Sequence, residues 1–136
     1  MTEVKLNNKF SLHDKYTLLE GRIILSGIQA LVRLLLDQNR ADLIKGLNTG
    51  TLVSGYRGSP VGMLDINLIR NKKLIDQHNI KFIPGVNEDL GATLIYGSQM
   101  AGMVSNVKYD GVMGMWYGKA PGVDRSGDIF RHANFL

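Results

Sequence analysis

Three short segments of this sequence combine glycine and proline with charged or polar side chains, and they are where the chain could do chemistry. The segments are SGYRGSP at 54–60, PGVNE at 84–88 and YGKAPGVDR at 117–125. Glycine lets the backbone approach a ligand closely, and proline stiffens the turn that contains it. One such turn is ordinary loop punctuation. Three of them, carrying Arg57, Asn87, Glu88 and Lys119, favour a binding or catalytic site.

Glu88 is the candidate catalytic group, and the sequence leaves two interpretations of it open. It lies at the predicted first turn of a helix, where the positive end of the helix dipole favours any carboxylate. The functional interpretation needs a carboxylate held in a crevice by packing. The helix that follows is rich in small residues: Gly91, Ala92, Gly97, Ser98, Ala101 and Gly102. Since each interior glycine costs roughly 1 kcal/mol relative to alanine, we expect this helix to approach another element or a ligand closely.

Several chemistries are excluded by what the sequence lacks. It contains no cysteine, so it offers no disulfide, thiolate nucleophile or iron–sulfur ligand. It has neither a G-x-G-x-x-G dinucleotide fingerprint nor a G-x-x-x-x-G-K-[ST] phosphate loop. The histidines, at positions 13, 78 and 132, are far apart and lack metal-ligand spacing. We therefore predict no metal site built from residues of this chain.

Charge and hydropathy exclude further classes. The net charge is +4, but residues 1–80 hold eleven basic and seven acidic groups while residues 81–136 hold five of each, so the basic excess is diffuse. We expect no nucleic-acid partner. No apolar run approaches the roughly 20 residues of a membrane helix, and the N-terminus has no apolar signal core. We expect a cytoplasmic protein without a membrane partner.

Each chemistry-bearing segment follows a predicted strand. Apolar residues at spacings of three and four predict a helix over 26–45, ended by Gly46. Further predicted elements are strands at 51–56, 80–83 and 111–117, helices at about 61–77 and 87–104, and the start of another helix near Ser126. This alternation predicts an α/β fold with a doubly wound, mostly parallel sheet and helices on both faces. The third strand is apolar on both sides, which suits a central position.

The position of the three turns in such a sheet matters, because ligands of open parallel sheets bind outside the carboxyl ends of the strands. The 136 residues suffice for one domain with a real core. Residues 1–20 are polar and aperiodic, so we predict an N-terminal arm that packs or frays, followed by the α/β domain at 21–136. The last helical pattern meets no terminating glycine or proline before Leu136, so we expect a domain truncated at its C-terminus.

Four segments, in order, resemble a known family. They are GIQAL at 27–31, SGYRGSP at 54–60, PGVNEDLGA at 84–92 and WYGKAPGVDRSGD at 116–128. They are similar to the N-terminal end of the long, fused indolepyruvate ferredoxin oxidoreductases, within the thiamine-diphosphate-dependent 2-oxoacid:ferredoxin oxidoreductase superfamily. The resemblance covers about residues 17–136. It implies a pyrimidine-binding domain, which contributes half of a cofactor site formed between two domains.

The resemblance also implies roles for matching residues. In that family the glutamate of the second motif contacts N1′ of the aminopyrimidine ring and shares a proton with it, and the matching residue is Glu88. The other implied cofactor-binding residues are Gly55, Tyr56 and Asn87. The implied substrate contacts are Arg57, Ser59, Lys119 and Arg125. For the last two, salt bridges within the loop or to a neighbouring domain stay open as an alternative.

The implied reaction is oxidative decarboxylation of a 2-oxoacid, indolepyruvate or another arylpyruvate, to an acyl-CoA, with electrons passed to ferredoxin. The sequence lacks the G-D-G motif with a downstream Asn that holds diphosphate and Mg²⁺ in the family, and it lacks cluster-binding cysteines. We therefore expect a partner domain or subunit that binds the diphosphate of thiamine diphosphate, [4Fe-4S] clusters outside this segment, and a homo-oligomer. The 136 residues alone are expected to be inactive.

Two alternatives stay open. The first is a related 2-oxoacid:ferredoxin oxidoreductase with another substrate, because the loops do not decide between aryl and alkyl side chains. The second is a non-catalytic α/β binding or interaction module that keeps the fold without the chemistry. These alternatives differ in whether Glu88 acts on a cofactor.

Overall fold

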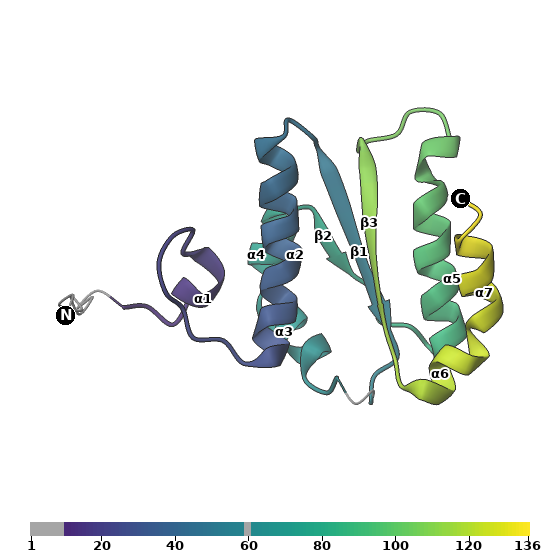
Figure 1. Cartoon of the computed structure of the whole chain (residues 1–136), viewed down its shortest axis with the longest axis horizontal. Coiled ribbons are helices and arrows are strands. Elements are labelled where there is room, and N and C mark those ends of the chain that lie inside the picture. Colours follow the sequence, from purple (N-terminus) through teal and green to yellow (C-terminus); the bar gives the residue numbers. More distant parts are fainter. Residues whose placement is uncertain (1–9, 59–60) are drawn as a thin grey trace.

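The computed structural model of the chain describes residues 10–58 and 61–136. Its elements, in chain order, are α1 (Asp14–Thr17), α2 (Gly27–Ile44), β1 (Thr49–Gly55), α3 (Leu64–Arg70), α4 (Lys72–Gln77), β2 (Ile80–Phe82), α5 (Glu88–Gln99), the 3-10 helix η1 (Met100–Met103), β3 (Gly111–Tyr117), α6 (Ala120–Arg125) and α7 (Gly127–Ala133). Strands and helices alternate (Figure 1), so the predicted α/β class is confirmed.

The strands form one parallel sheet in the order β2-β1-β3. β1 pairs with β2 from Thr51 opposite Ile80 to Val53 opposite Phe82, and with β3 along its whole length. The central strand of the described sheet is β1, so the prediction of a central position for residues 111–117 is wrong. β3 is apolar on both sides because helices cover both faces of the sheet, and this property does not depend on how many strands flank it.

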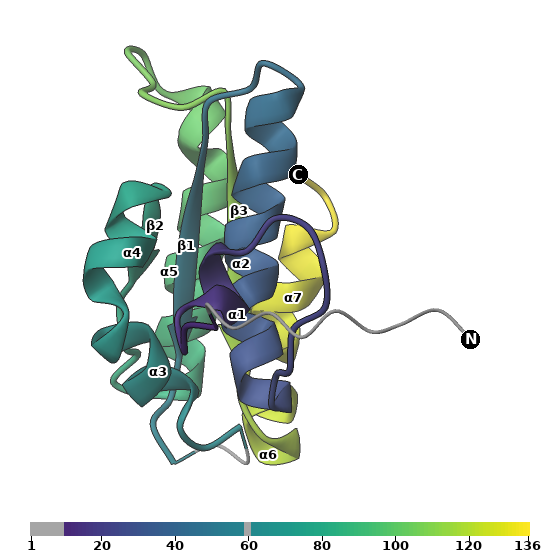
Figure 2. The same cartoon turned by 90° about the vertical axis from the view of Figure 1, so that its left-hand side faces the viewer.

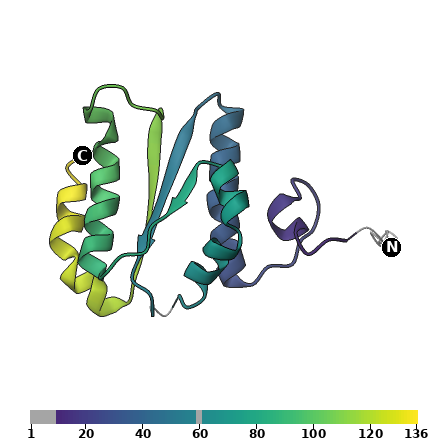
Figure 3. The ribbon, with the colours of Figure 1, turned by 180° about the vertical axis from the view of Figure 1, so that it is seen from behind.

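Helices lie on both faces of the sheet (Figure 1, Figure 3). α2, α3 and α4 cover one face, while α5 covers the other and has α7 packed outside it. The main core lies between the sheet and the α2 layer. Its buried members are Tyr16, Val32, Leu35, Leu36, Val53, Leu64, Leu68, Ile75, Ile80 and Tyr117. The α5 layer brings the start of α5 beside the ends of the strands, which positions Glu88.

The boundaries of α2 follow local sequence signals. Ser26 and Gln29 form a capping box, in which each side chain accepts a hydrogen bond from the backbone N–H of the other residue. At the other end Gly46 has a φ of 77°, a conformation that glycine adopts without steric cost. The predicted helix at 26–45 is therefore confirmed to within one residue at each end.

The predicted helix at 61–77 is instead two helices, α3 and α4. The break lies at Asn71, whose side chain donates to the carbonyl of Asn67 at 2.8 Å and whose backbone leaves helical geometry (φ −101°, ψ 20°). Asparagine side chains offer the backbone such alternatives to a continuous helix. Before α3, Met63 adopts a left-handed conformation with a φ of 75°, so helical geometry begins at Leu64.

The remaining predictions are close but shifted. The strand at 111–117 is confirmed, and the strands predicted at 51–56 and 80–83 are β1 and β2 with slightly different ends. The α-helix predicted over 87–104 stops at Gln99 and continues as η1. The helix expected near Ser126 is α7, but α6 before it was missed, although Pro121 in its first turn is a typical helix-starting signal.

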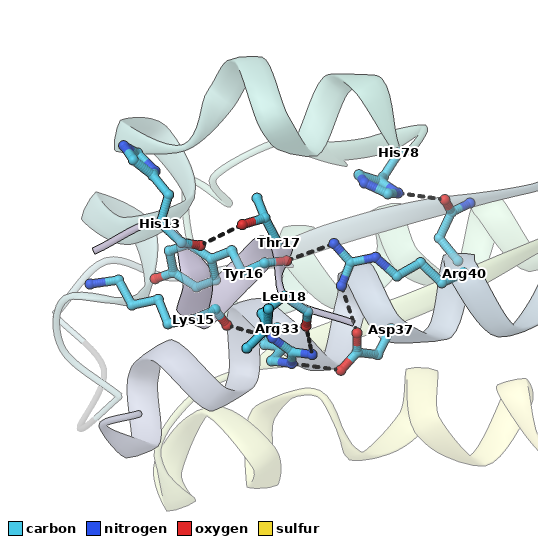
Figure 4. Close-up of polar contacts among 10 residues, drawn as sticks. His13, Lys15, Tyr16, Thr17, Leu18, Arg33, Asp37, Arg40 and His78 are labelled. Carbon is cyan, nitrogen blue, oxygen red and sulfur yellow. Dashed lines mark hydrogen bonds and ion pairs between the residues drawn. The ribbon is translucent and has the colours of Figure 1, made fainter. Parts of the chain in front are cut away.

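The N-terminal arm is docked on α2 within its described part (Figure 4). Two arginines of α2, Arg33 and Arg40, donate to backbone carbonyls at the end of α1 over 2.6–2.9 Å. The acceptors belong to Lys15, Tyr16 and Leu18. Asp37 forms an ion pair with each guanidinium group, with nitrogen–oxygen distances of 2.9 Å to Arg33 and 2.7 Å to Arg40. The ring of Tyr16 is buried. The arm therefore packs from α1 onward, while residues 1–9 lie outside the described residues.

Buried polar side chains also join α2 to the start of the sheet. Asn39 lies 2.9 Å from Nδ1 of His78, and Asp42 accepts a hydrogen bond from the Thr49 hydroxyl at 2.7 Å. Burial lowers the pKa of His78, and the nearby Arg40 guanidinium lowers it further. His78 is thus a packing histidine, as its isolation in the sequence predicts.

α2 is the longest helix in the described part of the chain, with 18 residues (Figure 2). It carries the charged residues Arg33, Asp37 and Arg40 in its middle.

Among the described residues, no helix combines the length and the apolar character needed to span a membrane.

Candidate functional site

The carboxyl ends of the three strands meet at one edge of the sheet, as their parallel order requires. Tyr56, just after β1, bridges to Gly85 after β2, and the Gly85 N–H donates to the Gly55 carbonyl at 2.9 Å. A Cβ at Gly55 would overlap the backbone and ring of Tyr117 at the end of β3. The structure therefore brings together the three segments that the sequence singles out.

Glu88 is the first residue of α5 and is fixed by contacts from three sides. Asn87 caps the helix, because its side chain accepts from the Leu90 N–H at 2.8 Å. The indole N–H of Trp116 donates to the backbone carbonyl of Glu88 at 3.2 Å. A Cβ at Gly122 would overlap Cγ of Glu88, so the backbone of α6 packs directly on the stem of this side chain. The same added Cβ would lie 3.1 Å from both Cβ and Cδ of Glu88, so the packing reaches from the stem to the carboxyl carbon.

The two adjacent carboxylates at the start of α5 differ in their partners. Asp89 pairs with Arg125 at 2.9 Å and accepts from the fully buried Ser126 hydroxyl at 3.4 Å. The carboxylate of the half-buried Glu88 has no hydrogen-bond or ion-pair partner among the residues that the structure describes. Both acids lie in the first turn, so both benefit from the helix dipole. Of these two acids, Glu88 is the one whose oxygens have no partner within residues 10–58 and 61–136.

The four predicted substrate contacts have different environments. Arg57 pairs with Asp65 of α3 at 3.3 Å, and Arg125 is held in its ion pair on α5. For Arg125 the structure thus favours the salt-bridge alternative. Lys119 is exposed just before α6 and has no ion-pair partner within residues 10–58 and 61–136. Ser59 lies outside the described residues.

Tyr117 carries a buried hydroxyl that has no hydrogen-bond partner in the described part of the chain. Burial raises the pKa of Tyr117 to about 12, the Asp65 carboxylate contributes to the rise, and the Arg57 guanidinium opposes it. A neutral phenol therefore lies beside the Arg57–Asp65 pair at the end of β3. The sequence does not reveal this environment, because strand and loop meet only in the folded chain.

The close approach expected of the small-residue helix is confirmed at one glycine. A Cβ at Gly91 would lie 3.3 Å from Oγ of Ser54 and 3.6 Å from Cα of Gly55, so α5 rests almost directly on β1. Added Cβ atoms at Gly97 and Gly102 would contact no described atom within 4 Å. Among the glycines of α5 and η1, the close approach thus belongs to Gly91, three residues after Glu88.

Three residues that position the site were missed by reasoning from the sequence: Asp89, Trp116 and Ser126. Alternation along β3 could have placed Trp116 on the same face as α5. The ion pair between Asp89 and Arg125 spans 36 positions and leaves no local signal in the sequence. Burial of the Ser126 hydroxyl depends on how α6 and α7 pack, which the sequence pattern does not specify.

Comparisons with protein-family models, with curated proteins and with solved structures found no match for this chain. In the described residues, no group of three or more His, Cys, Asp or Glu side chains could hold a metal ion. The candidate site is therefore defined by its geometry: a carboxylate with a fixed stem, free oxygens and a position where three strand ends meet.

Proposed function

We propose that this chain is the pyrimidine-binding part of a thiamine-diphosphate-dependent 2-oxoacid:ferredoxin oxidoreductase, and that its sheet is the first portion of a doubly wound domain. The observation that supports the proposal is the free carboxylate of Glu88 at the meeting point of three strand ends. A site that shares a proton with a ring nitrogen needs such a carboxylate, held within hydrogen-bond distance of that nitrogen and not paired with a neighbouring cation.

The residues present fit an aminopyrimidine ring. Gly122 presses on the Glu88 stem and leaves no room for a Cβ, so the carboxylate is oriented by backbone packing. Gly55 and Tyr56 would line the ring, and Asn87 would position Glu88 by capping α5. When bound, thiamine diphosphate supplies the carbon nucleophile and electron sink that decarboxylation requires. Glu88 would hold and return the proton at N1′.

The rest of the proposed enzyme lies outside this chain. A partner domain or subunit would hold the diphosphate and Mg²⁺, and iron–sulfur clusters elsewhere would pass electrons to ferredoxin. The substrates would be an arylpyruvate, such as indolepyruvate, and coenzyme A, in a cytoplasmic homo-oligomer. Lys119, which is exposed and unpaired within the described structure, is the substrate contact best supported by its surroundings. Arg57 is also near the site but would have to share its charge with Asp65.

The proposal is tested by Glu88→Gln in the full-length protein. Loss of a catalytic proton acceptor is expected to lower turnover of the 2-oxoacid about 10²- to 10⁴-fold. Because the carboxylate has no protein partner in the described structure, the variant should keep the wild-type circular dichroism spectrum and melting temperature. Glu20→Gln is the matched control, since Glu20 is exposed and far from the strand ends in sequence. Turnover of Glu88→Gln equal to that of Glu20→Gln would overturn the proposal.

Gly122→Ala tests the packing of the Glu88 stem. The added Cβ would overlap Cγ of Glu88 and displace the carboxylate, so we expect turnover to fall at least about tenfold while the chain stays folded. Gly127→Ala is the control, because a Cβ there meets no described atom within 4 Å. Equal turnover of the two variants would show that the position of the Glu88 stem does not matter for the reaction.

A non-catalytic module is distinguished from the enzyme by ligand binding. In the enzyme, calorimetry of the full-length protein detects thiamine diphosphate, whereas the 136-residue chain alone binds it weakly or not at all, because it lacks the diphosphate motif. A full-length protein that binds no thiamine diphosphate would identify the module. Micromolar binding by the 136-residue chain alone would contradict the proposed division of the cofactor site.

A further inference from the structure

A cavity of about 420 Å³ lies beside β2, away from Glu88. Its volume falls within the roughly 300–1,000 Å³ of small-molecule sites. The apolar wall open to a ligand is formed by the partly exposed Phe82 and Tyr109, because the core residues Leu68, Ile75 and Ile80, which also line the cavity, are almost fully buried. The cavity therefore offers a ready-made apolar surface.

Half of the eight other lining residues are cationic. Arg57, Lys72, Lys81 and Lys108 face the cavity, against one carboxylate, that of Asp76. Lys72 is neutralised by Asp76 at 2.5 Å, and Arg57 is held by its ion pair on α3. Lys81 and Lys108 have no ion-pair partner among the described residues, and the Lys108 ammonium lies 5.0 Å from the centre of the Tyr109 ring. Two positive charges are thus left beside an apolar wall.

The outer edge of β2 is unsuited to adding another strand. The Asn79 carbonyl and the Ile83 N–H bond to β1, so by alternation the backbone groups of Ile80 and Phe82 face away from it. β2 is only three residues long, Lys81 stands at its centre, and Pro84 follows with no N–H to donate. Short length, lysine and proline are the features by which natural edge strands resist pairing. A compact ligand therefore suits the cavity better than an extended peptide.

We propose that this cavity binds a small organic anion, with a flat apolar body against Phe82 and Tyr109 and an anionic head at Lys81 and Lys108. The charge complementarity of the two free lysines and the apolar wall carry this assignment. It is independent of the function proposed for Glu88.

The test titrates three probes into the ¹⁵N-labelled 136-residue chain: 2-naphthoate, 2-naphthyl phosphate and the neutral 2-naphthamide. We expect the anions to shift the amide signals of Ile80, Lys81, Phe82 and Tyr109, with a dissociation constant about tenfold lower than that of the amide. Whichever of the two anions has the lower dissociation constant identifies the preferred head group as carboxylate or phosphate. Equal affinity for all three probes would overturn the charge assignment.

A lysine variant localises the site. In Lys81→Gln/Lys108→Gln the affinity for the preferred anion should fall about tenfold, while that for 2-naphthamide stays unchanged. Lys73→Gln is the control, because Lys73 is an exposed lysine of α4 that does not line the cavity. No shift at β2 with millimolar anion, equal effects of the two variants, or tighter binding of an uncharged extended peptide than of the anions would each refute the proposal.

Discussion

The hydroxyl of Tyr117 is buried without a hydrogen-bond partner in the described structure, and its pKa is raised to about 12 by burial and by Asp65. An unfolded tyrosine titrates near pH 10. Between these values the unfolded chain loses this proton while the folded chain keeps it. Tyr117 therefore favours the folded state fully below about pH 10, and this contribution is lost as the pH rises toward 12, by up to about 2–3 kcal/mol.

Tyr117→Phe checks this titration. Removing an unpaired buried hydroxyl should leave the free energy of unfolding at pH 7 equal to that of the wild type, or raise it by about 1 kcal/mol. Between about pH 10 and pH 12 the wild type should lose more stability than the variant, as measured by urea denaturation at each pH. Parallel pH profiles of the two proteins would show that Tyr117 is not held neutral by its surroundings.

Glu88 and Asp89 show which part of the candidate site could be predicted from the sequence and which part could not. The position of Glu88 at a helix start beside other strand ends follows from the alternation of elements, and the structure agrees. That Asp89 and not Glu88 is paired with Arg125 does not follow, because the choice depends on which way two neighbouring side chains point around the first turn of α5. The free carboxylate of Glu88 is thus a property of packing.

Among the elements, α1 depends most on contacts outside itself. It has a single turn, and a helix this short is unstable alone. Its terminal carbonyls are satisfied by Arg33 and Arg40 (Figure 4). We expect Arg33→Ala/Arg40→Ala to release the segment and to speed trypsin cleavage after Lys15 by about tenfold or more, since each lost charged hydrogen bond costs about 1.5–3 kcal/mol.

Arg70→Ala is the control for this element, because Arg70 is an exposed arginine at the end of α3. It also removes a trypsin site, so cleavage after Lys15 is followed by mass spectrometry of that peptide alone. If the double variant is cut after Lys15 no faster than Arg70→Ala, the arginines do not hold α1 in place.

The elements that the sequence predicts best are those with signals at both ends. α2 has a capping box and a terminal glycine, and its predicted limits hold. The break at Asn71 was missed because apolar spacing continues through it, and the competing hydrogen bond comes from an asparagine side chain. The sequence left open whether the N-terminal arm packs or frays, because the partners of α1, Arg33 and Arg40, lie on another helix and form no local pattern.

For the whole molecule, strand order was the feature that sequence patterns did not determine. β3 is apolar on both faces, yet it lies at an edge of the described sheet.

The two edge strands of the described sheet differ in length and in their content of lysine and proline. β2 is short and is blunted by Lys81 and Pro84, whereas β3 has seven residues and contains neither lysine nor proline. The Asp110 N–H bonds toward β1, so by alternation the backbone groups of Met113 and Met115 face away from the sheet.

We therefore expect the 136-residue chain to self-associate through β3, because a long edge without charge or proline is a template for pairing. Sedimentation velocity should show a sedimentation coefficient that rises with concentration between about 10 and 200 µM. Over the same range, hydrogen exchange at the amides of Met113 and Met115 should slow. The outward amides of Ile80 and Phe82 are the internal control and should not change, because their edge resists pairing. A chain that stays monomeric, or protection that develops at β2 instead of β3, would contradict the assignment of β3 as the associating edge.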